Sequence, residues 1–496
     1  MDTLPAPYEI MAKIFFLCLS DDEELHPSRA PILLSQICRE WRETALAIPQ
    51  LWSTLHLPFT ERSDIIPALQ IWLEASGNLT LTFDAILTTS PADSISSRTE
   101  RQYIQILCSH SQRWHQVRLI LRSESSLEIF NANLPDNPFP ILRCIELRVL
   151  TSRHYAGIRT ESWNFTLLER LRSSPYLETL AIENWRQFAT FDQLPCSSLR
   201  HLWCCSISNT SFDVGKLTGT LRHCDHLASL HLEMTALSHL VLDVATPTHL
   251  PRLETLSLSF GNFLFLADVI NALYTPNLQA LRLQVQVDMY TPESVVPFAQ
   301  MLTDCTPSLK NLELSLRRTI YREPSVTSAI ANLRNLTSLT LDHVWFTEGI
   351  ITLFNSLTLP VSPDNMFIHS AQNVVLDQLY VGCEQGWQYE NYSQPFQFRF
   401  FESLANLVAS RWDLPPDATC SDGSPIHRLS LFHMGGEWVD DWENCNPESY
   451  RRVCKCWDEG LGGRPDVFDR NSIHQSVTGQ SLFGLSSSGH ITFGQT

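Results

Sequence analysis

Three cysteines and two histidines near the end of the printed sequence are of types that could bind a metal ion. They are Cys445, Cys454, Cys456, His427 and His433. Thiolate and imidazole groups are the ligands that zinc prefers. Their spacing, however, lacks the paired C-x-x-C knuckles of zinc motifs, and buried thiols usually act as small apolar side chains. The sequence therefore predicts no metal ligand and no cofactor.

The motifs that carry the common enzymatic chemistries are absent from the sequence. It contains no G-x-x-x-x-G-K, G-x-G-x-x-G, G-x-S-x-G or H-E-x-x-H. We therefore predict a non-catalytic protein. The formal net charge of −18 repels nucleic acid phosphates and anionic lipid. No apolar run approaches the length of a bilayer span, so neither nucleic acid nor a membrane is an expected partner.

Polar and aromatic residues alternate with leucines in a series of short segments, and they are the candidate binding residues. In a strand, residues out of phase with the leucines point to the opposite face. Any one of them is most simply a solvated side chain. As a row they would line the concave surface of a curved solenoid, where such proteins bind their ligands. The predicted substrate-binding residues are Thr179, Glu183, His201, Trp203, His231, Glu233, Arg282, Gln284, Glu313, Asp342, Tyr380 and Phe432.

These segments share the pattern L-x-x-L-x-L, with other apolar residues allowed at the leucine positions. Most of its steps fall near the ~20 to 29 residue period of leucine-rich repeats, in which short parallel strands stack. The sequence thus predicts an α/β fold, a curved solenoid of parallel strands over residues 52–435. The pattern begins at Trp52, Trp114, Leu142, Leu177, Leu199, Leu227, Leu253, Leu278, Leu309, Leu336, Leu376 and Ile426.

Two amphipathic helices are predicted before the repeats. The first covers residues 8–19 and has a wide apolar arc. The second has Pro31 in its first turn and carries one stripe that includes Leu34 and Ile37. So small a pair cannot bury this apolar surface against itself. Part of it must cap the following repeats, dock another protein, or do both on different faces.

The stretches "LPAPYEIMAKIFFLCL" and "PILLSQICREWRETALAIPQLW" resemble the F-box domain over about residues 3–57. The likeness is greatest to the F-box-like domains abundant in mushroom-forming fungi, although the chain has two extra residues, "AP", and a longer acidic loop. The repeats are similar to the irregular leucine-rich repeats that accompany F-boxes. By resemblance, a Skp-type adaptor would be contacted by residues among Pro5, Ile10, Ile14, Phe15, Leu33, Leu34, Ile37 and Trp41.

The resemblance implies the substrate-recognition subunit of a Skp-cullin-F-box E3 ubiquitin ligase, located in the cytoplasm or the nucleus. Its partners would be the adaptor, a cullin bound through that adaptor, and an unidentified substrate protein. The alternative is a non-enzymatic interaction scaffold whose F-box only caps the solenoid or binds the adaptor outside a ligase. The predicted domains are residues 1–57 for the F-box, 52–435 for the repeats, 436–470 for a C-terminal cap and 471–496 for a mobile tail.

Overall fold

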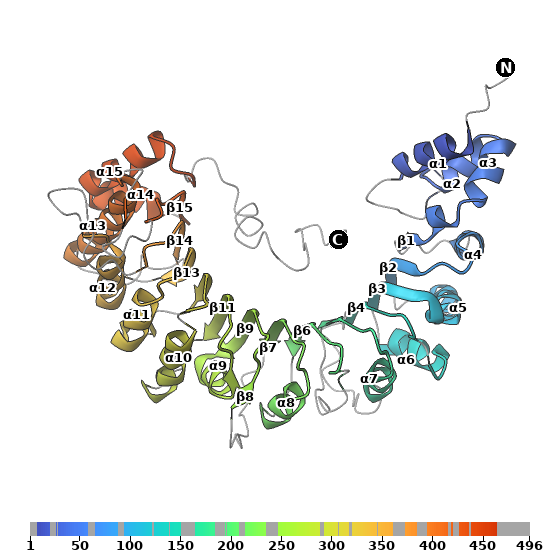
Figure 1. Ribbon diagram of the computed structural model, residues 1–496, viewed down its shortest axis with the longest axis horizontal. Helices are drawn as coiled ribbons and strands as arrows, with labels where there is room; N and C mark the ends of the chain where they lie inside the picture. The colour runs from blue at the N-terminus through green and yellow to red at the C-terminus, as the bar shows by residue number, and fades with distance from the viewer. Residues whose placement is uncertain are drawn as a thin grey trace. The chain divides into compact units, whose positions relative to one another are not determined.

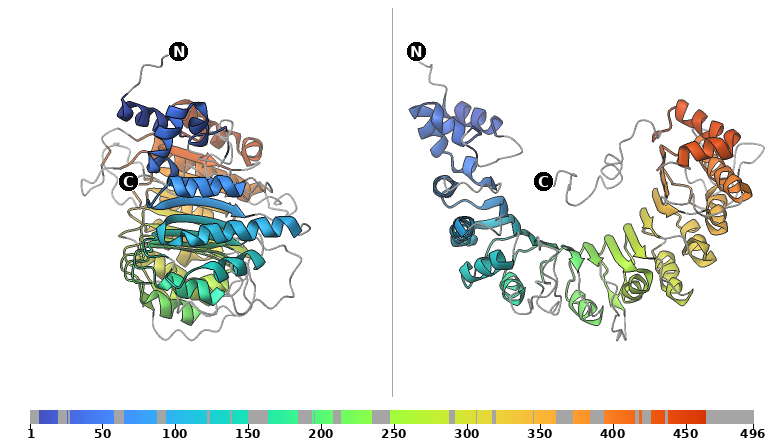
Figure 2. Two further views of the ribbon diagram at one scale, coloured as in Figure 1. Left: turned by 90° about the vertical axis from the view of Figure 1, so that its right-hand side faces the viewer. Right: turned by 180° about the vertical axis from the view of Figure 1, so that it is seen from behind.

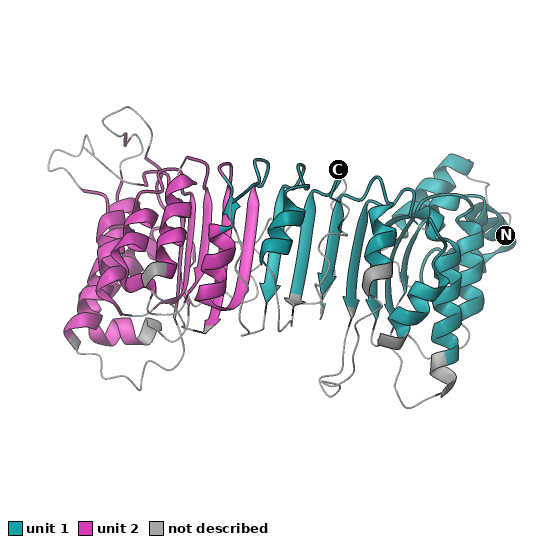
Figure 3. Ribbon diagram, turned by 90° about the horizontal axis from the view of Figure 1, so that it is seen from below, with its two compact units in different colours: residues 1–253, 272–275 teal, residues 254–271, 276–496 magenta. Residues whose placement is uncertain are grey.

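The computed structural model shows a chain that divides into two compact units, coloured separately in Figure 3. Unit 1 comprises residues 1–253 and 272–275, and unit 2 comprises residues 254–271 and 276–496. The structure describes residues 7–19, 26, 28–57, 65–87, 94–121, 124–137, 139–149, 164–183, 194, 196–207, 214–234, 247–287, 292–305, 307–316, 320–344, 346–360, 373–383, 394–414, 418–419, 426–435 and 438–463.

The main sheet contains 13 strands that follow one another in chain order, and every pair with a defined register is parallel. In unit 1 the strands are β1 (Thr54–Leu57), β2 (Leu81–Leu87), β3 (Trp114–Leu121), β4 (Cys144–Val149), β5 (Thr179–Glu183), β6 (His201–Ile207) and β7 (Ser229–Met234). In unit 2 they are β9 (Thr255–Asn262), β11 (Ala280–Val287), β12 (Asn311–Ser315), β13 (Ser338–Val344), β14 (Gln378–Cys383) and β15 (Leu431–Met434). A separate parallel pair in unit 1 joins β8 (Thr248–His249) and β10 (Leu273–Tyr274).

In the described chain, helices connect most of the successive strands. Within unit 1, Figures 1 and 2 show helices α5 to α8 along one face of the strands; we call the opposite face of the strands in each unit its open face. The helices of unit 1 are α1 (Tyr8–Leu17), α2 (Ile32–Ile37), α3 (Arg39–Leu46), α4 (Ile65–Ala75), α5 (Ser94–Ser109), α6 (Glu124–Asn133), α7 (Asn164–Arg172) and α8 (Val214–Leu221). Those of unit 2 are α9 (Phe263–Asn271), α10 (Pro292–Asp304), α11 (Pro324–Ala331), α12 (Glu348–Leu357), α13 (Gln394–Trp412), α14 (Trp438–Cys445) and α15 (Pro447–Asp458). Short 3-10 turns cover Pro49–Trp52, Ser111–Arg113 and Ile320–Arg322.

The leucine positions of the repeat pattern form the interior beneath the strands. In the repeat that begins at Leu227, for example, Leu227, Leu230 and Leu232 are buried, and the intervening His231 is partly exposed. Parallel strands whose helices cover one face bury that face's side chains. The predicted α/β class with a parallel sheet is confirmed, whereas the domain boundaries at residues 57, 435 and 470 stay predictions. The proposed tail at 471–496 lies outside the described residues.

Strand β2 is a member of the sheet that the repeat pattern misses. It lies between β1 and β3, where Phe83 pairs with Leu55 and Val117, and Ala85 pairs with Leu57 and Leu119. The two buried positions beside Leu55 and Leu57 are thus an aromatic residue and an alanine rather than two leucines. The long step in the pattern from Trp52 to Trp114 was the available sign of an additional strand.

The last strand has a different register from the predicted one. The pattern beginning at Ile426 made Leu431 an inward residue and Phe432 an outward one. In the structure Phe432 is fully buried and pairs with Leu379, while Leu431 is partly exposed. The placement of Phe432 on the binding surface is therefore wrong, because the interior positions of this strand are Phe432 and Met434.

The predicted second helix is two helices, α2 and α3. They separate at Cys38, whose backbone is extended, with φ −156° and ψ 173°. The Cys38 sulfur accepts a hydrogen bond from the Trp41 backbone N–H at 3.4 Å and so caps α3. Helix caps are residues of this kind, which satisfy a backbone N–H that the helix leaves without an intrahelical acceptor. The amphipathic pattern continues through the break, so periodicity alone does not reveal it.

A buried tryptophan joins the N-terminal helices to the first strand. The Trp52 indole N–H donates to the Ala45 carbonyl at the end of α3, at 2.8 Å. Its ring also meets Trp72 of α4 edge-on, with 5.2 Å between ring centroids. Leu51 and Trp52 are both buried immediately before β1. The helical segment is therefore packed directly onto the start of the sheet.

The register of β15 can be tested by two neighbouring truncations. Phe432→Ala removes a fully buried ring that stacks on Trp457 at 5.6 Å, and such changes cost about 3–5 kcal/mol. Leu431→Ala shortens a partly exposed side chain and should cost clearly less. Urea unfolding of both variants measures the difference; a larger loss for Leu431→Ala would contradict the observed register.

Candidate functional site

The first candidate surface is apolar and lies on helices α1 and α2. Ile10 and Ile14 are exposed on α1, and Leu33 and Ile37 are exposed on α2. In each helix the two residues are four apart, so they share one face. Large apolar side chains that remain exposed in groups mark interaction surfaces more often than scattered ones do. These four residues were all predicted to contact the adaptor, and we call them the helical apolar surface.

Other predicted adaptor residues form the interior of the helical segment. Phe15 and Leu34 are buried, which corrects their assignment as contact residues, because no partner can reach them while the helices are folded. Trp41 is partly buried, and its ring centroid lies 5.1 Å from that of Phe15. Phe15 and Trp41 therefore support the surface from beneath. Pro5 lies outside the described residues.

The second candidate surface is the open face of unit 1, where predicted binding residues come from three adjacent strands. Each of them is partly exposed and alternates with buried residues along its strand. The register places Thr179 beside His201, and Trp203 beside His231. Side chains opposite each other on adjacent strands are close enough to interact. The residues on this face are Thr179 and Glu183 of β5, His201 and Trp203 of β6, and His231 and Glu233 of β7.

A ladder of ion pairs crosses the open face over the first four strands. Asp84 lies 3.3 Å from His56 and 3.4 Å from Arg118, measured between the carboxylate oxygen and the ring or guanidinium nitrogen. Arg118 in turn lies 3.2 Å from Glu146. Burial raises the pKa of Glu146, although Arg118 and Arg148 act to lower it. Each charge in the ladder has an oppositely charged or ionisable neighbour, so this part of the face is held by internal pairing.

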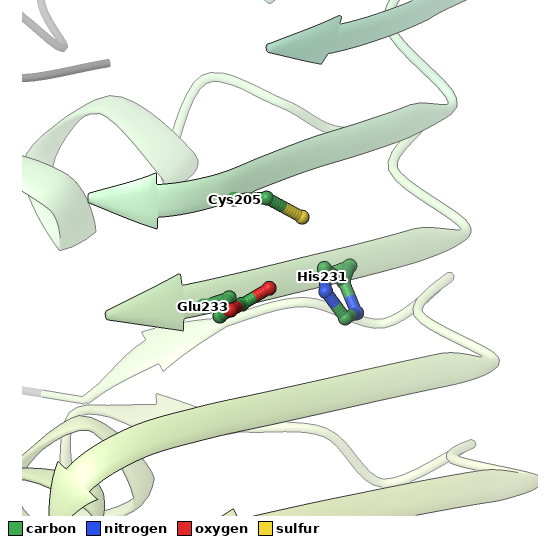
Figure 4. A group of neighbouring side chains, drawn as sticks. All are labelled: Cys205, His231 and Glu233. Atoms are coloured by element: carbon green, nitrogen blue, oxygen red, sulfur yellow. The ribbon is translucent and has the colours of Figure 1, made fainter. Parts of the chain in front are cut away.

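Beyond β5, three side chains of different chemistry gather on β6 and β7. Figure 4 shows Cys205 on one strand facing His231 and Glu233 on the next. One sulfur, one imidazole nitrogen and one carboxylate oxygen all lie within 4.8 Å of one another. Burial raises the pKa of the Cys205 thiol well above its ordinary value, and the nearby Glu233 adds to the increase. Among the described residues this is the one group of cysteine, histidine and acidic side chains close enough to share an ion.

Trp203 lies against this group. Its ring centroid is 4.2 Å from that of His231, and its indole N–H donates to the Cys205 sulfur. The ring contact orients the His231 imidazole, and the hydrogen bond orients the Cys205 thiol. Trp203 is thus the residue that holds Cys205 and His231 in their relative positions.

Unit 2 carries the other predicted binding residues on its own open face. Arg282 and Glu313 form an ion pair at 3.1 Å. The ring of Tyr380 stacks on that of His433, with 5.3 Å between the centroids. The predicted residues Gln284 and Asp342 are partly exposed. His433, one position after the misplaced Phe432, is the residue of β15 that lies beside Tyr380 on this face.

The cysteines and histidines first considered for metal binding do not gather in the described part of the chain. Cys445 ends α14, and Cys454 and Cys456 lie on α15. Burial raises the pKa of Cys456 to about 11, with Asp413 and Glu459 adding to the effect. His433 faces Tyr380 instead of these thiols.

Cys205 is the member of the β6–β7 group that was not among the predicted binding residues. His231 and Glu233 were predicted only as members of a row. Aligning "LRHLWCC" with "LASLHLE" sets Trp203 opposite His231 and Cys205 opposite Glu233. That alignment was the available sign, because equivalent positions of adjacent repeats become neighbours in the sheet.

The ion-pair ladder predicts a stability effect that depends on pH. Arg118→Met leaves the buried Glu146 and the adjacent Asp84 without their shared cation. Removing one partner of a buried pair costs about 3–5 kcal/mol, which we expect in urea unfolding at pH 7. A carboxyl group whose pKa rises on folding favours the folded state at low pH and loses that contribution as the pH rises through its pKa. The loss should therefore shrink at acid pH.

The matched control for this change is Arg143→Met. Arg143 and Glu178 form an exposed pair at 3.7 Å, so breaking it should cost less than about 1 kcal/mol at either pH. Equal losses for the two variants, or a loss for Arg118→Met that grows at acid pH, would show that the ladder is not a buried ion pair.

Two surfaces thus stand out: the helical apolar surface, and the open face with its Cys205 group. Within the described residues, no helix combines the length and apolar content needed to cross a bilayer. What the chain does must be inferred from these residues, because neither the known protein-family models nor the curated proteins match it.

Proposed function

We propose that this chain is the substrate-recognition subunit of a Skp-cullin-F-box E3 ubiquitin ligase. The N-terminal helices would bind a Skp-type adaptor, and the open faces of the strands would bind the protein to be modified. Such a subunit makes and breaks no bonds. It would contribute by holding its substrate close to the ubiquitin-carrying enzyme, which raises the effective concentration of the reacting groups.

The observation that carries this proposal is the helical apolar surface. Its four side chains stay exposed, whereas Phe15 of the same helical segment is fully buried. The segment therefore has its own interior and does not need these four side chains to form it. Burying a side chain of this size gains roughly 1.5–3 kcal/mol. A partner that covers several of them obtains a large part of a typical binding energy.

The positions of the exposed residues agree with the resemblance to the F-box domain. Four of the eight residues proposed for adaptor contact are solvent-exposed, and they come from both segments in which the resemblance lies. The exposed Leu17, three residues after Ile14, extends the apolar surface of α1. This neighbour favours a protein partner that covers the surface as a whole.

A non-enzymatic scaffold is the competing function, and one contact favours it. Trp52 is hydrogen-bonded to the end of α3 and packed against α4, so the helices also cover the beginning of the sheet. Terminal repeats need such a cover. In this alternative the helices act as a cap, or they bind the adaptor without forming a ligase.

Reconstitution from purified proteins distinguishes the two functions. The full chain would be mixed with a Skp-type adaptor and then with a cullin, and the assemblies separated by size. A complex that contains all three proteins supports the ligase subunit. An adaptor complex that excludes the cullin supports the scaffold, and failure to bind the adaptor would leave the helices as a cap.

A pair of isoleucines provides the sharpest test of the helical apolar surface. Ile37 of α2 is 53% exposed and Ile71 of α4 is 55% exposed, so truncating either should leave the melting temperature nearly unchanged. We expect Ile37→Ala to weaken adaptor binding at least tenfold, about 1.4 kcal/mol. Ile71→Ala, the matched control, should bind normally. Isothermal titration calorimetry with the full chain measures both affinities.

Phe15→Ala serves as the reference for a purely structural change. This ring is fully buried, so its loss should lower the free energy of unfolding of the helical segment by about 3–5 kcal/mol. Normal adaptor binding by Ile37→Ala would contradict the proposed surface. Weakened binding accompanied by early melting would instead place Ile37 in the interior.

A further inference from the structure

We propose that Cys205, His231 and Glu233 form a zinc-binding site on the open face of unit 1. The three side chains supply one sulfur, one nitrogen and one oxygen, all within 4.8 Å of one another. Ligands around a tetrahedral zinc ion at about 2.0–2.3 Å lie roughly 3.3–3.8 Å apart. Closing this difference requires small side-chain rotations and no movement of the strands.

The types of the three ligands favour zinc over other common metal ions. Calcium and magnesium prefer sets made of oxygen atoms alone. Copper(I) prefers thiolate and thioether ligands. A mixed set of cysteine, histidine and carboxylate suits zinc, which accepts sulfur, nitrogen and oxygen at similar distances.

The buried side chains of the two strands fix the positions of the ligands. Leu230 and Leu232 are completely buried, so His231 and Glu233, two residues apart, must project from the same face of β7. On β6, the buried Leu202 and Cys204 fix Trp203 and Cys205 in the same way. The open-face side chains of β6 and β7 therefore cannot turn away without exposing the interior.

The pairing of β6 with β7 is irregular beside Cys205. The register is regular from His201 to Cys204 and then shifts between Cys204 and Ile207. Irregularities of this type re-aim a side chain and occur often next to functional sites. Here the shift begins at the residue that supplies the sulfur ligand.

Trp203 provides the support that metal ligands usually have from their neighbours. Its indole N–H donates to the Cys205 sulfur, and its ring lies against that of His231. A donor to a ligating sulfur stabilises the negative charge of the thiolate, and a packed ring keeps the imidazole oriented. Residues in this position typically change metal affinity by about 10–100-fold.

The charges around the group distinguish it from the other charged residues of the open faces. Arg118 lies between Asp84 and Glu146, and Arg282 pairs with Glu313. By contrast, no basic side chain of the described chain forms an ion pair with Glu233. The neighbouring Glu183 is paired with Arg148. A cation bound there would complement the Glu233 carboxylate.

Three protein ligands leave one tetrahedral position of the ion free. His231 and Glu233 are partly exposed, so the free position faces the solvent side of the strands. A water molecule completes the coordination there. The site thus has the ligand number of an accessible zinc site rather than of a closed structural one.

Metal binding can be tested on the full chain, purified under reducing conditions and freed of metal with a chelator. Zinc would be titrated in competition with a chromophoric chelator. Cobalt(II) would serve as a spectroscopic substitute, because a thiolate ligand gives a sulfur-to-cobalt charge-transfer band. We expect one tight zinc site and a cobalt spectrum that has this band.

The variants assign the site to its residues. Cys205→Ser, His231→Gln and Glu233→Gln should each weaken zinc binding, and Cys205→Ser should do so at least ~100-fold and abolish the charge-transfer band. Trp203→Phe retains a ring but loses the N–H donor, and should weaken binding by about 10-fold or more. All four side chains lie on the open face, so circular dichroism and the melting temperature should stay unchanged.

Two exposed residues provide the controls. Cys18→Ser and His223→Gln remove a thiol and an imidazole elsewhere in unit 1, and both should bind zinc normally. Zinc affinity that is unaltered in Cys205→Ser, or a cobalt spectrum of the unmodified chain without a thiolate band, would overturn the proposal. Binding lost in Cys18→Ser but kept in Cys205→Ser would also overturn it.

Discussion

The interior leucines of the parallel strands are the constraint on which the rest of the structure depends. A strand alternates its side chains between two faces, so a slip of one residue would reverse every side chain. Leu230 and Leu232 are fully buried in β7, and a reversal would bury His231 and Glu233 in their place. Exposing two leucines and burying an unpaired carboxylate would cost several kcal/mol. The apolar interior thus determines which polar groups reach the open face, although it never touches a ligand.

The N-terminal helices obey a second constraint, which is size. About forty residues cannot bury all their apolar side chains in a single small interior. Phe15, Leu34 and Ala45 form that interior, and Trp52 uses another part of the surface to join the helices to β1. The isoleucines of α1 and α2 remain outside. The predicted cap and the predicted docking surface therefore involve different faces of the same three helices, and neither excludes the other.

The repeat sequence predicts the strands well where leucines define them and poorly where they do not. In β2 the positions beside Leu55 and Leu57 hold Phe83 and Ala85, so the strand lacks the two leucines that define the repeat pattern. At β15, "IHRLSL" and the following "LSLFHM" match the spacing equally well, and only packing against Trp457 decides for the second. The break at Cys38 was invisible because α2 and α3 keep one apolar period on both sides of it. Only at β15 did a tertiary contact decide between two local patterns of similar quality.

The Cys205 group shows what a repeat sequence determines and what it leaves open. Periodicity assigns His231 and Glu233 to a face, but every strand has such residues, and most of them pair with neighbours or remain solvated. Their distance from Cys205 depends on the irregular register after Cys204. Their charge balance depends on Arg148 of β4 pairing with Glu183 on the adjacent strand β5, three and two strands away from β7. A site of this kind arises from the differences between adjacent repeats, because a perfectly regular array would give every strand the same open-face neighbours.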